Sequence, residues 1–308
     1  MRTISRLNKV YKNAKVIPFD DTSKLVFFSD THRGDDSASD EFGKNKHIFY
    51  QAINHYYHNG FTYVEVGDGD ELWEHKNFEH IRNGHFSVFN KLKEIYDDGR
   101  MLMIFGNHNM EMKDPQWVKK NMYEVYDDYL EEKAPLFPGL EVYEAIRFQH
   151  KDTKQELFVV HGHQGDLLND QLAPFTRFMI RFFWHFVHHL GFSYAASPAK
   201  SRRKRHKVEK NYSKWNAENN TIIICGHTHR PRFPNPGESA YFNSGCGMHP
   251  RGITCLELVD GKFTLVTWRV HSKQDGILFI KRTVLKGPVS IREYSKNKIG
   301  DDLHDKLH

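Results

Sequence analysis

Residues 221–229 read Thr-Ile-Ile-Ile-Cys-Gly-His-Thr-His. The β-branched run at 221–224 is typical of a buried strand rather than a helix. Gly226 lets the backbone turn and approach a neighbour closely. Because His227 and His229 are two residues apart in an extended segment, their imidazoles point to the same side, as metal ligands at a strand end would. Two solvated loop histidines are an equally good interpretation in a chain that has 21 histidines.

Four other apolar runs also end in polar clusters. In an open α/β sheet, functional sites lie beyond the carboxyl ends of the strands. One such cluster is ordinary turn chemistry, but five of them at strand ends predict a shared site. The four further clusters are 30–36 (DTHRGDD), 67–71 (GDGDE), 106–109 (GNHN) and 161–166 (HGHQGD).

The donors in these clusters suit two divalent cations. Mixed carboxylate, amide and imidazole sets favour Mn, Fe or Zn over Ca or Mg, which prefer oxygen alone. We expect manganese, with iron or zinc as alternatives. Two metals roughly 3.5–4 Å apart stabilise the attacking and leaving oxygens of a displacement at phosphorus, and one carboxylate, here Asp68, can bridge them. The candidate ligands are Asp30, His32, Asp68, Asn107, His161, His227 and His229.

The order and spacing of these motifs resemble the calcineurin-like metallophosphoesterases, over about residues 24–270. The resemblance implies an α/β fold, a two-sheet sandwich flanked by helices, that carries a dinuclear metal site and hydrolyses phosphoester or pyrophosphate bonds with a metal-bridging hydroxide. It assigns His108 to the phosphate and the leaving group. It places three ligands on each metal around a bridging Asp68, namely Asp30, His32 and His229 on one and Asn107, His161 and His227 on the other.

Three features depart from the family pattern or stay open. The family usually has an acid where this chain has Asn109, so either the Asn109 amide orients His108 or Glu111 substitutes. His163 is an alternative ligand to His161, which directly follows its strand. Arg33 is the first choice for substrate phosphate, because a planar guanidinium suits that anion.

The segment 167–218 is predicted to be a helical insertion, aromatic at 171–192 and then basic. Residues 200–214 hold eight Lys/Arg against Glu209 alone, so the chain's net charge of +5 is concentrated there. Residues 171–214 are typical of an interfacial element that meets an anionic membrane surface. A cap helix packed on the core, followed by a solvated basic loop, is the alternative and is slightly favoured.

We expect one metallophosphoesterase domain over residues 1–285, interrupted by the insertion, and a polar tail over 286–308. The chain shows no secretion signal and no run of the ~18 apolar residues that would span a bilayer, so we expect a cytoplasmic or peripheral membrane protein. The place of the insertion resembles the UDP-diacylglucosamine pyrophosphatase group, which implies a lipid- or nucleotide-linked phosphoester as substrate. That group has Arg where this chain has His108. A nuclease or phosphodiesterase that tracks nucleic acid with the basic run, and a general phosphomonoesterase, are the alternatives.

Overall fold

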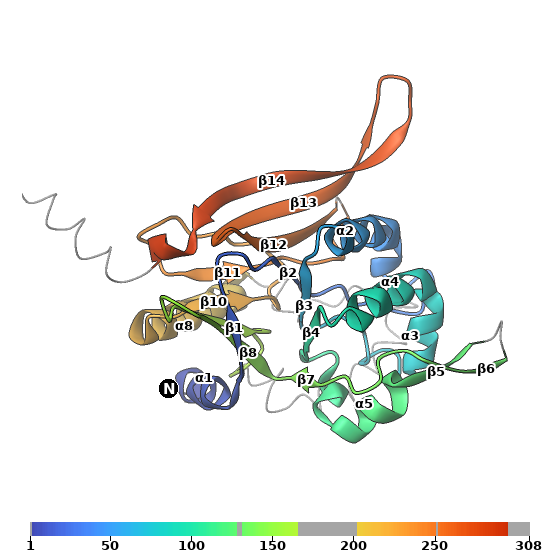
Figure 1. Cartoon of the computed structure of the whole chain (residues 1–308), viewed down its shortest axis with the longest axis horizontal. Coiled ribbons are helices and arrows are strands. Elements are labelled where there is room, and N and C mark those ends of the chain that lie inside the picture. Colours follow the sequence, from blue (N-terminus) through green and yellow to red (C-terminus); the bar gives the residue numbers. More distant parts are fainter. Residues whose placement is uncertain (1, 128–130, 166–201, 251, 295–308) are drawn as a thin grey trace, which may run out of the picture.

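Two facing β-sheets with helices on their outer faces form the molecule (Figure 1). The computed structural model describes residues 2–127, 131–165, 202–250 and 252–294. The α/β two-sheet sandwich expected from the sequence is confirmed. The predicted aromatic helix at 171–192, and with it most of the predicted cap, lies outside the described residues.

The larger sheet has seven strands and mixes parallel and antiparallel pairing. Its centre, β2–β3–β4, is parallel, and β12, β13 and β14 continue it in antiparallel fashion. Successive residues of β2 point into two different apolar clusters, one on each face of the sheet. A strand that is buried on both faces is apolar throughout, without the alternation of a half-exposed strand. In spatial order the strands are β14 (Leu278–Ser290), β13 (Lys262–Ser272), β12 (Ile253–Val259), β2 (Leu25–Phe28), β3 (Thr62–Val66), β4 (Met101–Ile104) and β7 (Val142–Tyr143).

The smaller sheet has five strands. β9 and β10 pair in parallel, so their carboxyl ends lie at the same edge. β10 begins one residue later than the run at 221–224 predicts and ends at Cys225. In spatial order the strands are β1 (Lys15–Phe19), β8 (Ala145–His150), β9 (Glu156–Val160), β10 (Ile222–Cys225) and β11 (Tyr241–Asn243); β5 (Glu124–Asp127) and β6 (Glu132–Pro135) form a separate ribbon.

The helices lie on the two outer faces. α1 and α8 pack on the five-stranded sheet, and α2 and α4 pack on the seven-stranded sheet. None of the described helices is long and apolar enough to cross a bilayer. The α-helices are α1 (Arg2–Asn13), α2 (Lys46–His58), α3 (Phe78–Gly84), α4 (Phe86–Asp97), α5 (Pro115–Met122) and α8 (Arg202–Asn219), and the 3-10 turns are η1 (Phe42–Asn45), η2 (Met110–Lys113) and η5 (Ile291–Tyr294).

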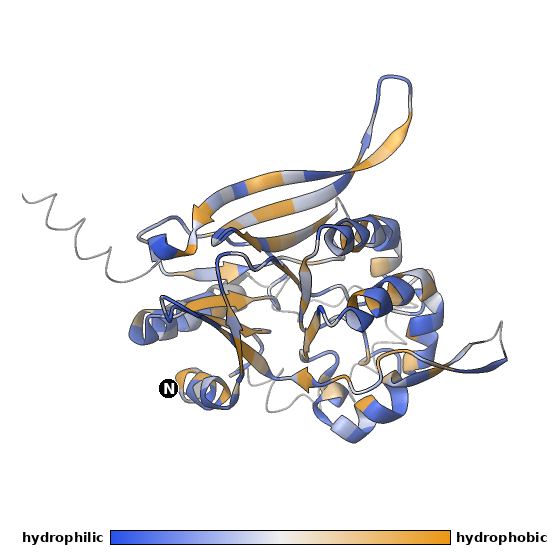
Figure 2. Ribbon diagram, viewed as in Figure 1, coloured by the Kyte–Doolittle hydropathy of each residue, from blue (hydrophilic) through white to orange (hydrophobic). Residues whose placement is uncertain are grey.

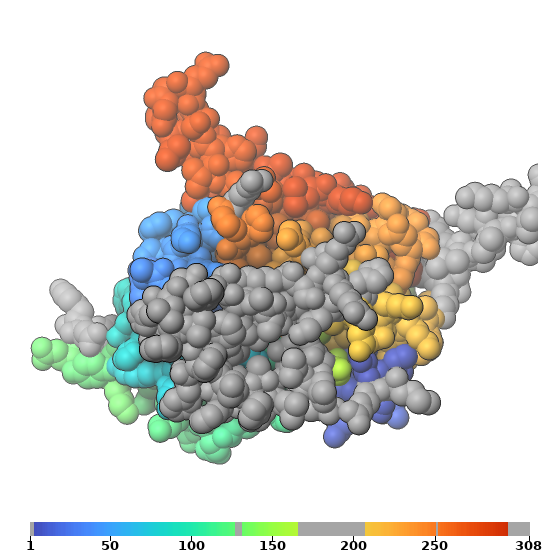
Figure 3. All heavy atoms as spheres, turned by 180° about the vertical axis from the view of Figure 1, so that it is seen from behind, coloured from blue at the N-terminus to red at the C-terminus, as the bar shows by residue number. Residues whose placement is uncertain are grey.

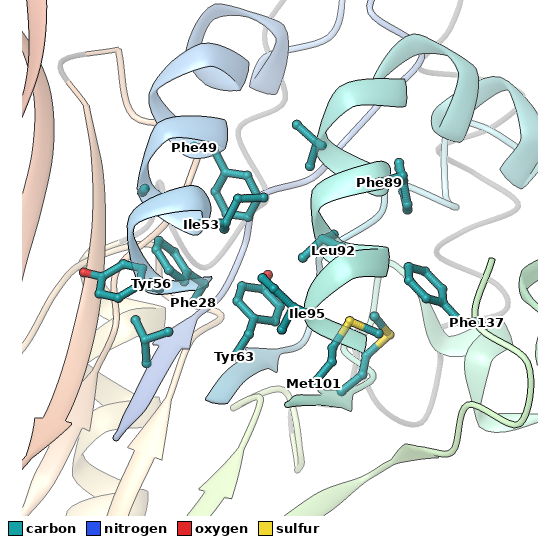
Figure 4. Packing of buried hydrophobic residues seen from close by; sticks show 14 of the residues in the cluster. Phe28, Phe49, Ile53, Tyr56, Tyr63, Phe89, Leu92, Ile95, Met101 and Phe137 are labelled. Atoms are coloured by element: carbon teal, nitrogen blue, oxygen red, sulfur yellow. The ribbon is translucent and has the colours of Figure 1, made fainter. Parts of the chain in front are cut away.

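Three apolar clusters separate these layers. Phe28 and Tyr63 of the seven-stranded sheet meet Phe49 of α2 and Leu92 of α4 (Figure 4). A second cluster fills the space between the sheets, and a third lies under α1 and α8. The strands carrying the polar clusters are therefore buried on both faces and fixed in position.

Both ends of the described chain contribute to the core, and the C-terminal end differs from the expectation. In α1, Leu7 and Val10 lie one helical turn apart and cover the smaller sheet. The expected tail from residue 286 is wrong at its start, because β14 continues to Ser290 and Ile291 and Tyr294 are buried. The folded part of the chain therefore reaches Tyr294.

Candidate metal centre

The five predicted clusters meet where the carboxyl ends of β2, β3, β4, β9 and β10 come together. Within the larger sheet, the amide of His32 donates to the carbonyl of Asp68 at 2.9 Å. The two sheets are joined by the Asp30 carboxylate, which accepts the amide of His227 at 2.9 Å and 3.1 Å through its two oxygens. The parallel strands thus bring residues from distant parts of the sequence to one edge.

Glycines make this close approach feasible. A Cβ on Gly226 would lie 2.4 Å from an Asp30 carboxylate oxygen, and a Cβ on Gly67 would lie 2.5 Å from the His161 ring. Gly67 also has φ +81°, a conformation that glycine adopts without cost. Each glycine directly precedes a candidate ligand, so the Gly-Asp and Gly-His pairs in the sequence have a steric reason.

Most candidate ligands have a strained backbone. Left-handed φ values cost an L-residue about 1–3 kcal/mol each and persist only where the surroundings enforce them; they cluster at functional sites. Five of the seven candidate ligands are in this region: Asp30 (52°), His32 (47°), Asp68 (51°), His227 (64°) and His229 (52°).

One group of donors consists of Asp30, His32 and His229. Nε2 of His229 lies 3.1 Å from Oδ1 of Asp30 and 3.3 Å from Nε2 of His32. One donor atom from each residue lies within 4.8 Å of the others. A carboxylate and two imidazoles converging in this way can hold a divalent cation.

A second group consists of Asp68, His161 and His227, all buried. Nδ1 of His161 lies 2.8 Å from the carbonyl of Val66, and its Nε2 lies 3.0 Å from Oδ2 of Asp68. The hydrogen bond to Val66 fixes the ring so that Nε2 is the metal-binding nitrogen, an arrangement common in metal sites. Nε2 of His227 is buried and has no hydrogen-bond partner among the described residues.

Asp68 lies between the two groups. Its Oδ2 is 3.0 Å from His161 in the second group and 3.9 Å from Nε2 of His32 in the first. Its Oδ1 accepts the amide of His108 at 2.7 Å, which holds the loop after β4 against it. Oδ1 of Asn107, in that same loop, is buried without a partner in the described part of the chain. Unpaired buried acceptors are costly, and a cation bound here would satisfy them.

The charges of the site are mutually dependent. Burial alone would lower the pKa of His161, but the carboxylates of Asp68 and Asp30 outweigh it and raise that pKa to about 9. Burial opposes ionisation of Asp68 as well, yet the neighbouring imidazoles hold its pKa well below the usual range. Burial, together with the charge of His161, lowers the pKa of His227, which leaves that imidazole neutral and able to bind a metal.

The geometry separates the two histidines that the sequence left open. His161 belongs to the Asp68 group, whereas His163 lies with its ring centroid 5.4 Å from that of His161. His163 is buried, and Nδ1 has no partner among the described residues. We therefore retain His161 as the candidate ligand, with His163 beside it.

His108 is oriented by an acid that sequence reasoning had not assigned to it. Its Nδ1 lies 2.7 Å from the carboxylate of Glu71, and its ring stacks on Trp73 with centroids 4.2 Å apart. The proposed role of Asn109 is wrong, since Oδ1 of Asn109 accepts the amide of Gly106 instead. Glu71 also lies 2.7 Å from Nδ1 of His32, so one carboxylate fixes both rings. The signal in the sequence that could have identified Glu71 is its position three residues after Asp68.

The expected phosphate contact by Arg33 is wrong. The side chain is fully buried and bonds both oxygens of Glu65, at 2.8 Å and 2.9 Å, and Oδ1 of Asp70 at 2.8 Å. Its planar fork is occupied by these carboxylates. The amide of Arg33 also donates to the carbonyl of Gly69, so Arg33 joins the loop after β2 to the loop after β3.

Comparisons with known proteins give only remote likenesses. No family model matches the chain, and no curated protein matches it by sequence. Among solved structures, the chain is similar to Vps29 of Entamoeba histolytica, solved with Zn²⁺, at 13% identity and a TM-score of 0.36, covering 85% of this chain and 99% of that one. It is also similar to a cold-active protein-tyrosine phosphatase of a psychrophilic Shewanella species, at 13% identity and a TM-score of 0.38, covering 88% and 83% of the two chains. Both TM-scores are low, so the assignment of the site rests on the residues of this chain alone.

Proposed function

We propose that the chain is a metal-dependent phosphoester hydrolase with a dinuclear centre. The observation that carries the proposal is the meeting of donor residues from five strand ends, with Asp68 between two separate groups. The buried Oδ1 of Asn107 and Nε2 of His227 support it. Neither atom has a hydrogen-bond partner among the described residues, and each can bind a cation.

The residues divide into two sets around the shared carboxylate. We assign Asp30, His32 and His229 to one cation, and Asn107, His161 and His227 to the other. Such a donor set suits Mn²⁺ best, with Fe or Zn as alternatives. When bound, two such cations stabilise charge on phosphate oxygens and lower the pKa of a coordinated water.

His108 is the proposed acid of the site. With Nδ1 bonded to Glu71, Nε2 is the nitrogen that can face a substrate, and 26% of the side chain is exposed. Burial would lower its pKa, but in the metal-free protein Glu71 and then Asp68 raise it to about 9, which favours the protonated imidazole. Protonated His108 can donate to a phosphate oxygen or to the departing oxygen. Glu71 and Trp73 hold the ring for that transfer.

For the substrate, we propose a phosphorylated small molecule, with a lipid- or nucleotide-linked ester as first choice. Two features of the insertion support this: its place between the motifs, which resembles the UDP-diacylglucosamine pyrophosphatase group, and its aromatic and basic composition over 171–214. The same composition supports contact with an anionic membrane surface.

The test combines metal content with turnover. The protein is loaded with Mn²⁺, its metal is quantified, and hydrolysis of bis-p-nitrophenyl phosphate is measured beside p-nitrophenyl phosphate, nucleic acid and a nucleotide-linked pyrophosphate. We expect two metals per chain and metal-dependent turnover that Asp68→Asn abolishes. The exposed Asp152→Asn is the control and should behave as wild type. Full activity in Asp68→Asn would refute the dinuclear site.

A further inference from the structure

Asn243 is the last residue of β11 and lies beside the end of β10, paired in register with Cys225. Its side chain is completely buried. Figure 2 shows the hydrophobic colour along β10, the strand that leads into the turn with the candidate ligands His227 and His229. A buried amide is costly unless its hydrogen bonds are made, so the partners of Asn243 indicate what it holds in place.

The side-chain amide of Asn243 makes its hydrogen bonds next to the candidate metal centre. Nδ2 donates to the carbonyl of Gly226 at 2.6 Å and to Oγ1 of Thr228 at 3.1 Å. Oδ1 accepts the amide of Gly245 at 2.9 Å. A carbonyl only accepts and a backbone amide only donates, so this position needs a side chain that does both. Asparagine meets that need, whereas an ionised aspartate has nothing to donate to Gly226.

The turn that Asn243 holds carries one candidate ligand for each cation. It runs from Gly226 to His229, and the amide of Thr228 closes it by donating to the carbonyl of Gly226 at 2.7 Å. His227 and His229 both have left-handed backbones, with φ of 64° and 52°. Such a conformation persists only where the surroundings enforce it. The bonds from Asn243 reach the residues on both sides of His227 and supply that constraint.

The loop after β11 also reaches the ligand loop that follows β2. Oγ of Ser244 lies 2.8 Å from Oγ of Ser29, and the amide of Gly247 donates to the carbonyl of Asp30 at 3.0 Å. Because β2 and β11 belong to different sheets, this loop joins the two sheets at the candidate metal centre. We call residues 243–247 the clamp loop.

The clamp loop is fixed at both of its ends. Nδ2 of Asn45, in η1, donates to the carbonyls of Gly247 and His249 at 2.9 Å and 3.0 Å. Figure 3 shows orange residues of this part of the chain beside the blue residues around α2. At the other end, the backbones of Asn243 and Arg232 exchange hydrogen bonds of 3.0 Å in both directions. The loop can therefore hold a strained turn without being displaced itself.

We propose that Asn243 is a positioning residue, which holds His227 and His229 in the orientation that binds the two cations. The inference rests on the proposed dinuclear centre. Asn243 acts through the backbone and Thr228 rather than through a ligand side chain. Because the turn carries one ligand for each cation, loss of this support weakens the binding of both cations together. Loss of a single ligand weakens one of them.

Metal titration of two matched asparagine variants tests the proposal. Asn243→Ala binds both Mn²⁺ ions about 10- to 100-fold more weakly than wild type, the usual effect of removing a group that orients metal ligands. Asn216→Ala is the control, because Nδ2 of the buried Asn216 donates to the carbonyls of Thr221 and Ala240. It removes a similar buried amide at the opposite end of β10 and β11, and it keeps wild-type metal affinity. Denaturant unfolding without metal measures what each substitution costs the fold.

A second pair of variants changes only the acceptor within the turn. Thr228→Val removes Oγ1 and keeps the branched shape of this buried side chain, whereas Thr228→Ser keeps the hydroxyl. Thr228→Val binds both ions more weakly, and Thr228→Ser binds them like wild type. If Asn243→Ala does not fold, this pair decides, and equal binding by its two members overturns the positioning role.

The outcomes separate this inference from the proposed function. If wild type and Asn243→Ala bind two ions equally well, the positioning role is overturned and the dinuclear centre stands. The same conclusion follows if Asn216→Ala weakens binding as much as Asn243→Ala does, because lost stability would then explain both. A wild type that binds no Mn²⁺ refutes the dinuclear centre itself, and this inference with it.

Discussion

The carboxylate of Glu71 lies 2.7 Å from Nδ1 of His108 and is the main reason why the pKa of that imidazole is raised to about 9 despite its burial. The pair fixes which nitrogen faces the substrate and, in the metal-free protein, favours the protonated imidazole. This relationship gives the first prediction.

Glu71→Gln removes the negative charge and keeps the shape. We expect kcat to fall about 10²-fold or more, as when a general acid loses its support. Because Glu71 raises the pKa of His108, removing its charge should move the alkaline fall in activity to lower pH. A pH–rate profile measures both effects. The exposed Glu79→Gln is the control, and an unchanged alkaline limb in Glu71→Gln would contradict the assignment.

Arg33→Lys tests the buried pairing beneath the site. Lysine keeps the charge but cannot bond Glu65 and Asp70 together, since it lacks the planar fork. Leaving one of these buried carboxylates without its hydrogen bonds costs about 1–3 kcal/mol of unfolding free energy, and metal affinity falls with it because the two ligand loops are no longer held together. Denaturant unfolding and metal titration measure these losses. The exposed pair of Arg292 with Asp21 is the control, where Arg292→Lys costs less than about 1 kcal/mol. Equal stability of the two variants would be the contrary result.

Metal binding becomes tighter as the pH rises. His161, whose pKa is about 9 in the metal-free protein, must lose its proton to bind a cation, so apparent affinity increases about tenfold per pH unit from about pH 6.5 to 9. Without metal, the raised pKa stabilises the fold fully below the unfolded-state pKa of about 6.5, and this contribution is lost as the pH rises through 9. The difference between the melting temperatures in Mn²⁺ and in chelator should therefore widen over that range. A constant difference would show that no such proton is displaced.

Replacing His161 and His163 separately distinguishes ligand from neighbour. His161 lies 3.0 Å from Asp68, and His163 does not belong to that group. His161→Gln should lose one of two bound metals, and His163→Gln should retain both, as counted by elemental analysis. Both substitutions are in one loop, so each is the control for the other. Loss of metal only in His163→Gln would reverse the assignment.

The strands and the convergence of their polar ends were predictable, because both depend on local signals. A run such as 101–105 is apolar throughout and is followed at once by Gly106 and the donor residue Asn107. Parallel strands place such donors at the same edge whatever the loop lengths. The approach of Asp30 to His229 also requires the docking of the two sheets, because β2 and β10 belong to different sheets.

The pairing of charged side chains within the site was not predictable in this way. Arg33 and Glu71 both follow ligand motifs, but their positions in the sequence do not say which side chains they contact. Their actual partners depend on a short bridge between the backbones of Arg33 and Asp70, which aligns the two loops and turns Arg33 inward. The spacing of residues in the sequence does not predict that alignment. The burial of Ile291 and Tyr294 was missed for a similar reason, since only the completed sheet provides the surface that covers them.

The candidate metal centre also has a consequence for the order of folding. The centre joins residues that are 197 positions apart in the chain, Asp30 with His227 and His32 with His229. Contacts between such distant positions form late, because closing the intervening chain is entropically costly. A cation therefore finds its complete set of donors only after both sheets have docked. Added metal should slow unfolding of this protein far more than it speeds folding.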